Sequence, residues 1–152
     1  MDEPRLLDLY CKAGGSSAGY HRAGFDVTGV DIEPQPHFPF TFILGDALAY
    51  VEAHGHEYDA IAASPPCQGF TKATKQWRAA GRIYPNLIAE CRSVIQATGK
   101  LYVIENVKGA PLLNPIMLNG AMFGLLVQRD RLFECSFPMP MPLLPQNKRP
   151  VK

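Results

Sequence analysis

Short apolar runs recur along the chain, and most of them are unbroken rather than alternating with polar residues. They predict strands at residues 5–10, 25–31, 41–44, 58–63, 100–107 and 131–137. Unbroken apolar runs are typical of strands that are covered on both faces of a sheet. Helices are expected between these strands, at residues 18–23, 47–53 and 85–97.

The alternation of strands and helices predicts an α/β fold with a mostly parallel, doubly wound sheet. Such folds bind ligands at the carboxyl ends of their strands. Ser16 or Ser17 is expected to cap the first helix. We expect one domain over residues 1–137, and an extended or disordered arm over the proline-rich, basic residues 138–152.

The composition adds limits to this picture. The 152 residues suffice for one domain with a core, and 47% hydrophobic residues is ordinary for a globular protein. No apolar run approaches the roughly 18 residues of a membrane span, and the N-terminus does not resemble a signal peptide. We therefore expect a cytoplasmic protein. The four cysteines form no C-x-x-C pair, which argues against a zinc site, any other metal centre or a disulfide framework.

Charge is divided unevenly along the chain. Residues 1–60 hold ten acidic and three basic residues, whereas residues 61–152 hold four acidic and twelve basic residues. The second part therefore suits a polyanion, and the first suits a ligand with hydroxyl groups or positive charge. Chance segregation of the charges is the alternative.

The end of the first strand suggests a nucleotide-like cofactor. Gly14 and Gly15 form a turn before a helix, where the backbone can approach a ligand closely. Asp31 ends the next strand, as an acid that accepts hydrogen bonds from ribose does, and Asp46 follows the third strand. Tyr10 is placed to stack on an adenine. The alternative to ligand binding is that Asp31 and Asp46 stabilise a turn or cap a helix.

A second group combines a thiol with an acid. Cys67 follows a strand on a loop stiffened by Pro65 and Pro66, and Glu105 and Asn106 end the neighbouring strand. A thiol nucleophile beside a carboxylic acid suits addition to an electrophilic ring whose nitrogen the acid protonates. A rigid turn for Cys67 and a strand-end ion pair for Glu105 are the alternatives.

Two basic segments follow. The first carries Trp77 and suits phosphate contact with an aromatic side chain nearby, or is simply a solvated basic helix face; its basic residues are Lys72, Lys75, Arg78 and Arg82. In the second, Arg129 and Arg131 project to one side of a strand start, where they can hold an anion.

Taken together, these motifs resemble the carbon-5 cytosine DNA methyltransferase family. DLYCKAGGSSAG resembles its first motif, SPPCQGF its nucleophile motif, IENVKG its Glu-Asn-Val motif, and LNGAMFGLLVQRDRLFE the segment with paired arginines. The resemblance implies a Rossmann-like fold, S-adenosylmethionine as cofactor and DNA as substrate, and it leads us to expect a bacterial or phage-infected cell as the source. It also implies the cofactor-binding residues Tyr10, Cys11, Gly14, Gly15, Asp31, Ile32, Asp46, Ala47 and Pro65.

The implied reaction begins when the Cys67 thiolate adds to carbon 6 of cytosine. Glu105 then protonates or hydrogen-bonds ring nitrogen 3, and carbon 5 takes the methyl group. Arg131 would orient the base, and Asn106 would support the loop of Cys67. The resemblance places Pro66 and Arg129 in the same catalytic group.

The sequence also departs from the family pattern. Val127 stands where the family has a glutamine, and about 15 residues follow the paired-arginine segment where the family has its target-recognition region. The chain therefore resembles only the catalytic half of a member of this family. Three hypotheses stay open: an enzyme that needs a second subunit or a homo-oligomer for recognition, an enzyme acting on a smaller or single-stranded substrate, and a non-catalytic binder of cofactor or nucleic acid.

Overall fold

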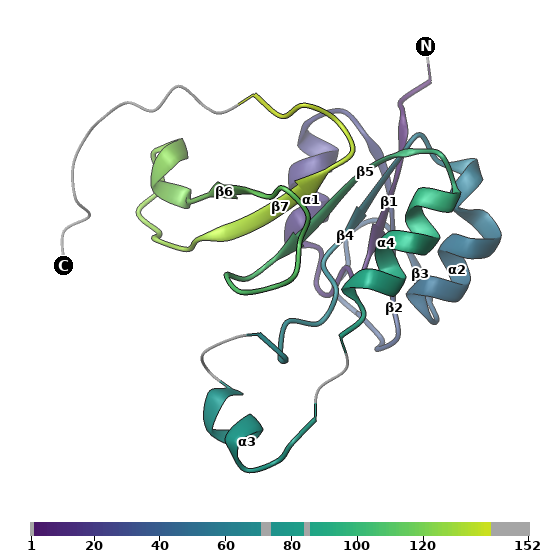
Figure 1. The fold of residues 1–152 in the computed structure, drawn as a ribbon. Helices are drawn as coiled ribbons and strands as arrows, with labels where there is room; N and C mark the ends of the chain where they lie inside the picture. Colours follow the sequence, from purple (N-terminus) through teal and green to yellow (C-terminus); the bar gives the residue numbers. More distant parts are fainter. Residues whose placement is uncertain (1, 71–73, 84–85, 141–152) are drawn as a thin grey trace.

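A seven-stranded sheet forms the centre of the computed structural model, which describes residues 2–70, 74–83 and 86–140. The strand order is β3-β2-β1-β4-β5-β7-β6 (Figure 1). Strands β1 to β5 run parallel, while β7 is antiparallel to both of its neighbours. The strands are β1 Arg5–Leu9, β2 Asp26–Asp31, β3 Thr41–Leu44, β4 Ala60–Ala63, β5 Leu101–Asn106, β6 Ile116–Leu118 and β7 Arg131–Cys135.

Helices cover both faces of the sheet, as the unbroken apolar runs predicted. Helices α2 (Ala47–His54) and α4 (Ile88–Ala97) lie together on one face, and α1 (Gly15–Arg22) lies on the other (Figure 1). The short helix α3 (Lys75–Ala79) stands away from both layers. Two 3₁₀ helices, η1 (Gly55–Glu57) and η3 (Gly120–Phe123), complete the elements. The predicted doubly wound α/β fold is confirmed.

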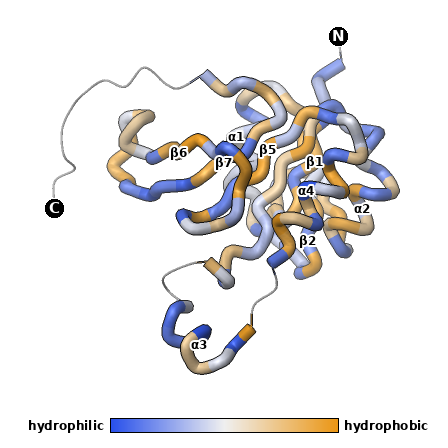
Figure 2. The backbone as a smooth tube through the Cα atoms, viewed as in Figure 1, coloured by the Kyte–Doolittle hydropathy of each residue, from blue (hydrophilic) through white to orange (hydrophobic). Residues whose placement is uncertain are grey.

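The larger core lies between the sheet and the α2–α4 layer. Alternate residues of β1, β4 and β5 point into it, and Ile88, Cys91 and Ile95 meet them from α4. A smaller cluster forms under α1, where Leu6, Val27 and Ala62 are buried against Tyr20. Figure 2 shows hydrophobic stretches running through the central strands. Because both faces of the central strands are buried, these strands appear in the sequence as continuous apolar runs.

The start of the first helix differs from the prediction. Gly14, with φ 86°, is the N-cap of α1, and Ser16 and Ser17 lie inside the helix. Both hydroxyls instead donate to Oδ2 of Asp8, at 2.9 and 2.5 Å. Asp8 is buried in β1, so its carboxylate takes the serine hydroxyls that would otherwise cap the helix. Burial raises the pKa of Asp8, although these two hydrogen bonds act in the opposite direction.

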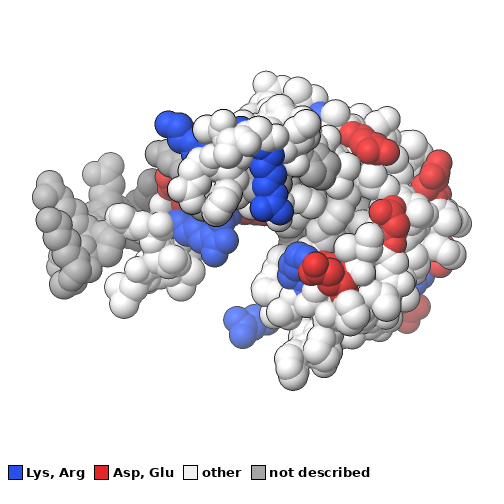
Figure 3. Space-filling view, turned by 90° about the horizontal axis from the view of Figure 1, so that it is seen from below, with Lys and Arg blue, Asp and Glu red and all other residues white. Residues whose placement is uncertain are grey.

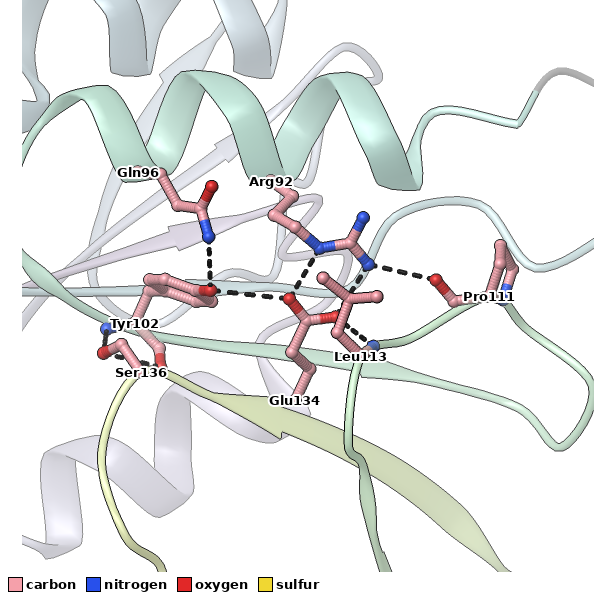
Figure 4. Close-up of polar contacts among 7 residues, drawn as sticks. All are labelled: Arg92, Gln96, Tyr102, Pro111, Leu113, Glu134 and Ser136. Atoms are coloured by element: carbon pink, nitrogen blue, oxygen red, sulfur yellow. Dashed lines mark hydrogen bonds and ion pairs between the residues drawn. The ribbon is translucent and has the colours of Figure 1, made fainter.

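The antiparallel strand β7 is fastened by a buried ion pair. Glu134 accepts hydrogen bonds from Arg92 Nε at 2.6 Å and Nη2 at 2.7 Å, and from the Leu113 amide at 2.8 Å (Figure 4). The same guanidinium donates to the Pro111 carbonyl, and the Tyr102 hydroxyl lies 3.4 Å from Glu134. One carboxylate thus joins α4, β5, β7 and the loop after β5.

Element boundaries shift slightly from the predicted ones. Strands β1, β2, β4, β5 and β7 are shorter than predicted, and α4 begins at Ile88 rather than at residue 85. Residues 84–85 and, in the expected arm, 141–152 lie outside the described residues. None of the helices in the described part of the chain has the length and hydrophobicity that a membrane span requires.

Candidate functional site

A cavity of about 430 Å³ opens at the carboxyl ends of the parallel strands. Figure 3, viewed from the side of these strand ends, shows several basic side chains around a hollow, an acidic one beside a basic one at its rim, and further acidic ones across the rest of that face. Loops after β1, β2, β4 and β5 and the start of β7 supply the walls. The lining residues are Tyr10, Lys12, Asp31, Ile32, Asp46, Ala47, Ser64, Pro65, Pro66, Cys67, Gln68, Leu87, Glu105, Asn106, Val107, Arg129 and Arg131.

Most residues singled out from the sequence line this cavity. All six of the expected catalytic group do so, as do six of the nine expected cofactor residues. Cys11, Gly14 and Gly15 do not: Cys11 is buried, and Gly14 packs beneath Phe38. Sequence reasoning gave no site role to Lys12, Ser64, Gln68, Leu87 and Val107, although all of them except Leu87 stand inside the quoted motifs.

Asp31 forms a charged centre at the end of β2. Its buried carboxylate accepts hydrogen bonds from the backbone amides of Lys12 and Glu33, both at 3.0 Å. Lys12 Nζ lies 3.6 Å from Asp31 Oδ1 and 2.9 Å from Glu33 Oε2. The hydrogen bonds fix the orientation of the Asp31 carboxylate. Asp31 therefore stabilises the turn, as the alternative interpretation of the sequence proposed, and it also lines the cavity.

The backbone beside Asp31 is unusual. Tyr10 and Lys12 have φ values of 60° and 47°, a left-handed region that non-glycine residues rarely adopt. Such conformations persist only where the surrounding structure enforces them, and they cluster at functional sites. Here the amide of Lys12 is held by Asp31 and that of Cys11 by the Val30 carbonyl. The turn therefore presents Tyr10 and Lys12 to the cavity.

Two glycines permit this close packing. A Cβ on Gly14 would lie 3.0 Å from the Phe38 ring, and one on Gly29 would lie 2.3 Å from that ring and 2.7 Å from Cys11 Sγ. All three distances are shorter than ordinary van der Waals contact.

Asp46, further along this wall, caps α2 by accepting a hydrogen bond from the Ala49 amide at 2.8 Å.

The loop of Cys67 is fixed to the neighbouring strand. Asn106 is buried at the end of β5, and its Nδ2 donates to the Pro65 carbonyl at 2.9 Å. Its Oδ1 accepts from the Val107 amide, also at 2.9 Å. Pro66 adds stiffness because its φ is restricted. Cys67 itself is partly exposed and lines the cavity.

The acid and one arginine of the site form an ion pair. Arg131 Nε lies 2.7 Å from Glu105 Oε1, and each side chain is about a quarter exposed, at 23% and 26%. The pair spans the antiparallel ladder between β5 and β7, where Glu105 is opposite Phe133. A guanidinium and a carboxylate side by side can together hold a ring that has both an acceptor and a protonatable nitrogen.

The loops that carry these residues are tied to each other. Lys108 Nζ lies 2.5 Å from Asp130 Oδ2, and Asn119 Nδ2 donates to Asp130 Oδ1. The hydrogen bond from Lys108 and then that from Asn119 hold the pKa of Asp130 below its usual value. Asp130 stands between Arg129 and Arg131, so this contact fixes the start of β7 beside the cavity.

The expected nucleic-acid residues lie on the segment after Cys67. Arg78 donates to the Gln68 carbonyl at 3.1 Å, while Lys75 and Arg82 are exposed on and after α3. Lys72 lies outside the described residues. Within the described ranges no three His, Cys, Asp or Glu side chains gather as a metal site would require.

Comparison with known sequences gives one family and several of its members. A family described as C-5 cytosine-specific DNA methylase matches residues 5–115. The Type II methyltransferase M.XorII of Xanthomonas oryzae is 34% identical over 126 residues, which are 72% of this chain and 29% of that protein. M.AquIA of Picosynechococcus is 34% identical over 127 residues, covering 70% and 50%. The chain thus spans half or less of the length of these relatives.

Solved structures share the fold. The S. pombe Dnmt2 methyltransferase superposes with a TM-score of 0.59 at 17% identity, covering 91% of this chain and 52% of that one. A SAM-dependent methyltransferase from Agrobacterium tumefaciens gives 0.51 at 17% identity, covering 87% and 55%. At such identities the likeness establishes a Rossmann-like methyltransferase fold, as the sequence motifs implied.

Proposed function

Because the chain belongs to the C-5 cytosine-specific DNA methylase family, we propose that it transfers a methyl group from S-adenosylmethionine to carbon 5 of cytosine in DNA. One observation supports this most directly. Cys67, the Glu105–Arg131 pair and the strand-end acid Asp31 come from four separate segments and line one cavity. A nucleophile, a ring-binding pair and a ribose-binding acid are the groups that this reaction needs.

The chemistry of one wall fits the cofactor. Asp31 offers a fixed carboxylate for the ribose hydroxyls, and Tyr10 offers an aromatic face for the adenine ring. Asp46 keeps one carboxylate oxygen on the Ala49 amide, and its other oxygen suits the adenine amino group. When bound, S-adenosylmethionine supplies the methyl group that carbon 5 receives.

The opposite wall fits the cytosine. The Cys67 thiolate adds to carbon 6, and the electrons of the carbon 5–carbon 6 double bond move towards carbon 5. Glu105 stabilises this charge by donating a proton or a hydrogen bond to ring nitrogen 3, and Arg131 holds the base from the same side. Carbon 5 then takes the methyl group, and a base removes the proton that carbon 5 still carries. The electrons of that carbon–hydrogen bond restore the carbon 5–carbon 6 double bond, and the sulfur–carbon 6 bond breaks to release the Cys67 thiolate.

For a duplex substrate, we expect target recognition to come from polypeptide beyond the residues that the structure describes. In duplex DNA the cytosine must leave the base stack, at a cost of a few kcal/mol. The described residues supply a reaction site and a basic segment, but a second subunit, a second copy or further residues would choose the sequence. A single-stranded cytosine substrate needs no such opening.

Transfer of a tritiated methyl group tests the proposal. The chain is incubated with labelled S-adenosylmethionine and with duplex DNA, single-stranded DNA or a cytosine nucleotide, and the products are digested to bases. Label is expected on carbon 5 of cytosine. Cys67→Ser should abolish it, whereas Cys135→Ser, a change at a partly exposed cysteine outside the cavity, should keep it.

The outcomes separate the alternatives. Label on the single strand or nucleotide alone would favour the smaller substrate. Cofactor binding without label on any cytosine, even with partner polypeptide from the native source added, would leave the non-catalytic binder as the better account. Full activity of the Cys67→Ser chain would remove the covalent step.

A further inference from the structure

Helix α3 lies in the sequence between Cys67 and α4. Gln68 and Leu87 lie near the two ends of this segment, and both line the cavity. Between them the structure describes residues 74–83, which contain α3 and no buried residue. Figure 1 shows α3 set apart from the sheet and from the other helices.

Helix α3 is bonded to the loop of the thiol. Thr74 Oγ1 and Arg78 Nη1 both donate to the Gln68 carbonyl, at 2.5 and 3.1 Å. Arg78 also donates to Thr74 Oγ1 at 2.7 Å. Gln68 directly follows Cys67, so the position of α3 is linked to that of the nucleophile.

Trp77 is exposed at the centre of this helix. Its residue exposure is 51%, and it is the chain's one tryptophan. Tryptophan side chains usually bury most of their large apolar surface, which makes an exposed indole on a protruding helix a candidate contact. In the sequence Trp77 stands between Lys75 and Arg78, and no acidic residue occurs between Asp59 and Glu90. A ligand that suits this surface has flat rings and negative charge.

We propose that Trp77 is a stacking platform for a nucleobase of the strand that carries the target cytosine. The neighbouring phosphates then lie beside Lys75 and Arg82. Base stacking on an aromatic side chain accepts any base, because every base has a flat face, while cations follow the backbone. This inference rests on the proposed function for the kind of polymer, but binding of a strand does not require methyl transfer.

The single tryptophan makes the contact directly measurable. A short cytosine-containing oligodeoxynucleotide, added to the whole chain at low salt, is expected to quench Trp77 emission in a saturable way. Its affinity is measured separately from the anisotropy of a dye-labelled copy. Trp77→Ala should weaken that affinity about tenfold, because stacking contributes roughly 1–3 kcal/mol per base. Trp77→Phe, which keeps an aromatic face, should retain most of the affinity.

Controls separate stacking from charge and from folding. Trp77→Ala should leave the salt dependence of binding unchanged, whereas Lys75→Gln should reduce its slope, because the lysine contacts phosphate and the indole does not. Leu101→Ala removes an apolar side chain of similar exposure (55%) at the far, amino end of β5, and should bind normally. Binding of S-adenosylhomocysteine, followed by calorimetry, should be the same in all four variants.

Three results would overturn the proposal: no binding of the oligonucleotide, binding without a change in Trp77 emission, or Trp77→Ala binding as tightly as the unaltered chain. Strand binding that depends on Trp77 in a chain without methyl transfer would instead contradict the proposed function alone.

Discussion

Replacing Glu134 by alanine is expected to destabilise the whole domain. Glu134 and Arg92 have side chains only 4% and 12% exposed, and the carboxylate receives the guanidinium through two hydrogen bonds of 2.6 and 2.7 Å. The substitution leaves the guanidinium buried with no carboxylate beside it. It also removes the acceptor of the Leu113 amide, so the loop after β5 loses its fastening to β7.

The magnitude follows from this burial. Breaking a buried ion pair from one side costs about 3–5 kcal/mol, because the remaining charge keeps its desolvation penalty. A domain of this size has a total stability of roughly 5–15 kcal/mol, so the loss is a large fraction of it. Replacing both partners, as in Arg92→Met with Glu134→Leu, should cost much less than the two single changes together, because no charge stays buried.

Urea unfolding followed by far-ultraviolet circular dichroism measures these differences. Trp77 fluorescence is unsuitable, because the indole lies outside the core. Glu134→Ala should lower the midpoint strongly, and Leu101→Ala, an exposed position, should leave it nearly unchanged. A loss below about 1 kcal/mol for Glu134→Ala, or a double variant that equals the sum of the singles, would refute the reasoning.

The same pair predicts a pH dependence. Burial alone would raise the pKa of Glu134, but the hydrogen bonds from Arg92 and Leu113 and the guanidinium charge outweigh it and hold the pKa below its usual value. A lowered pKa in the folded state means that the stabilisation is present above the unfolded pKa, roughly 4.3, and is lost as the pH falls through the folded value. The stability gap between the unaltered chain and Glu134→Gln should therefore narrow below about pH 4.

Two further predictions concern the cavity. Asp31→Ala should weaken S-adenosylhomocysteine binding by roughly ten- to a hundredfold, because the two ribose hydroxyls lose their charged hydrogen-bond acceptor. An affinity that calorimetry finds unchanged would contradict this role of Asp31. Asn106→Ala should lower methyl transfer and cost roughly 1–3 kcal/mol of stability while leaving cofactor affinity near normal, because the Pro65 carbonyl loses its donor. Cofactor affinity that falls in step with activity would show that Asn106 does not act through the loop of Cys67.

The sequence predicted the parallel part of the sheet well, for a physical reason. Strands β1, β2 and β4 are buried on both faces, and such burial requires unbroken apolar runs that are easy to recognise. The antiparallel direction of β7 could not be predicted, because an apolar run does not indicate whether a strand pairs parallel or antiparallel with its neighbours. Strand β6 was missed because it has three residues and only partial burial.

Candidate residues were predicted where the motif itself makes the contact. Cys67, Asp31 and Glu105 stand at strand ends, so the topology alone brings them to one edge. Lys12 and Leu87 reach the cavity through a left-handed turn and a loop after α3, which local patterns do not encode. The error at Ser16 and Ser17 has a similar origin, because the buried Asp8 competes for their hydroxyls.

The place of β7 within the sheet has a consequence for synthesis on the ribosome. It is the last strand in the described sequence, yet it lies between β5 and β6 rather than at an edge. Until residues 131–135 emerge, β6 lacks the strand with which it pairs, and β5 has an open side. A nascent chain can therefore complete the Asp31 wall early, while the contact between Glu105 and Arg131 is the last part of the cavity to form.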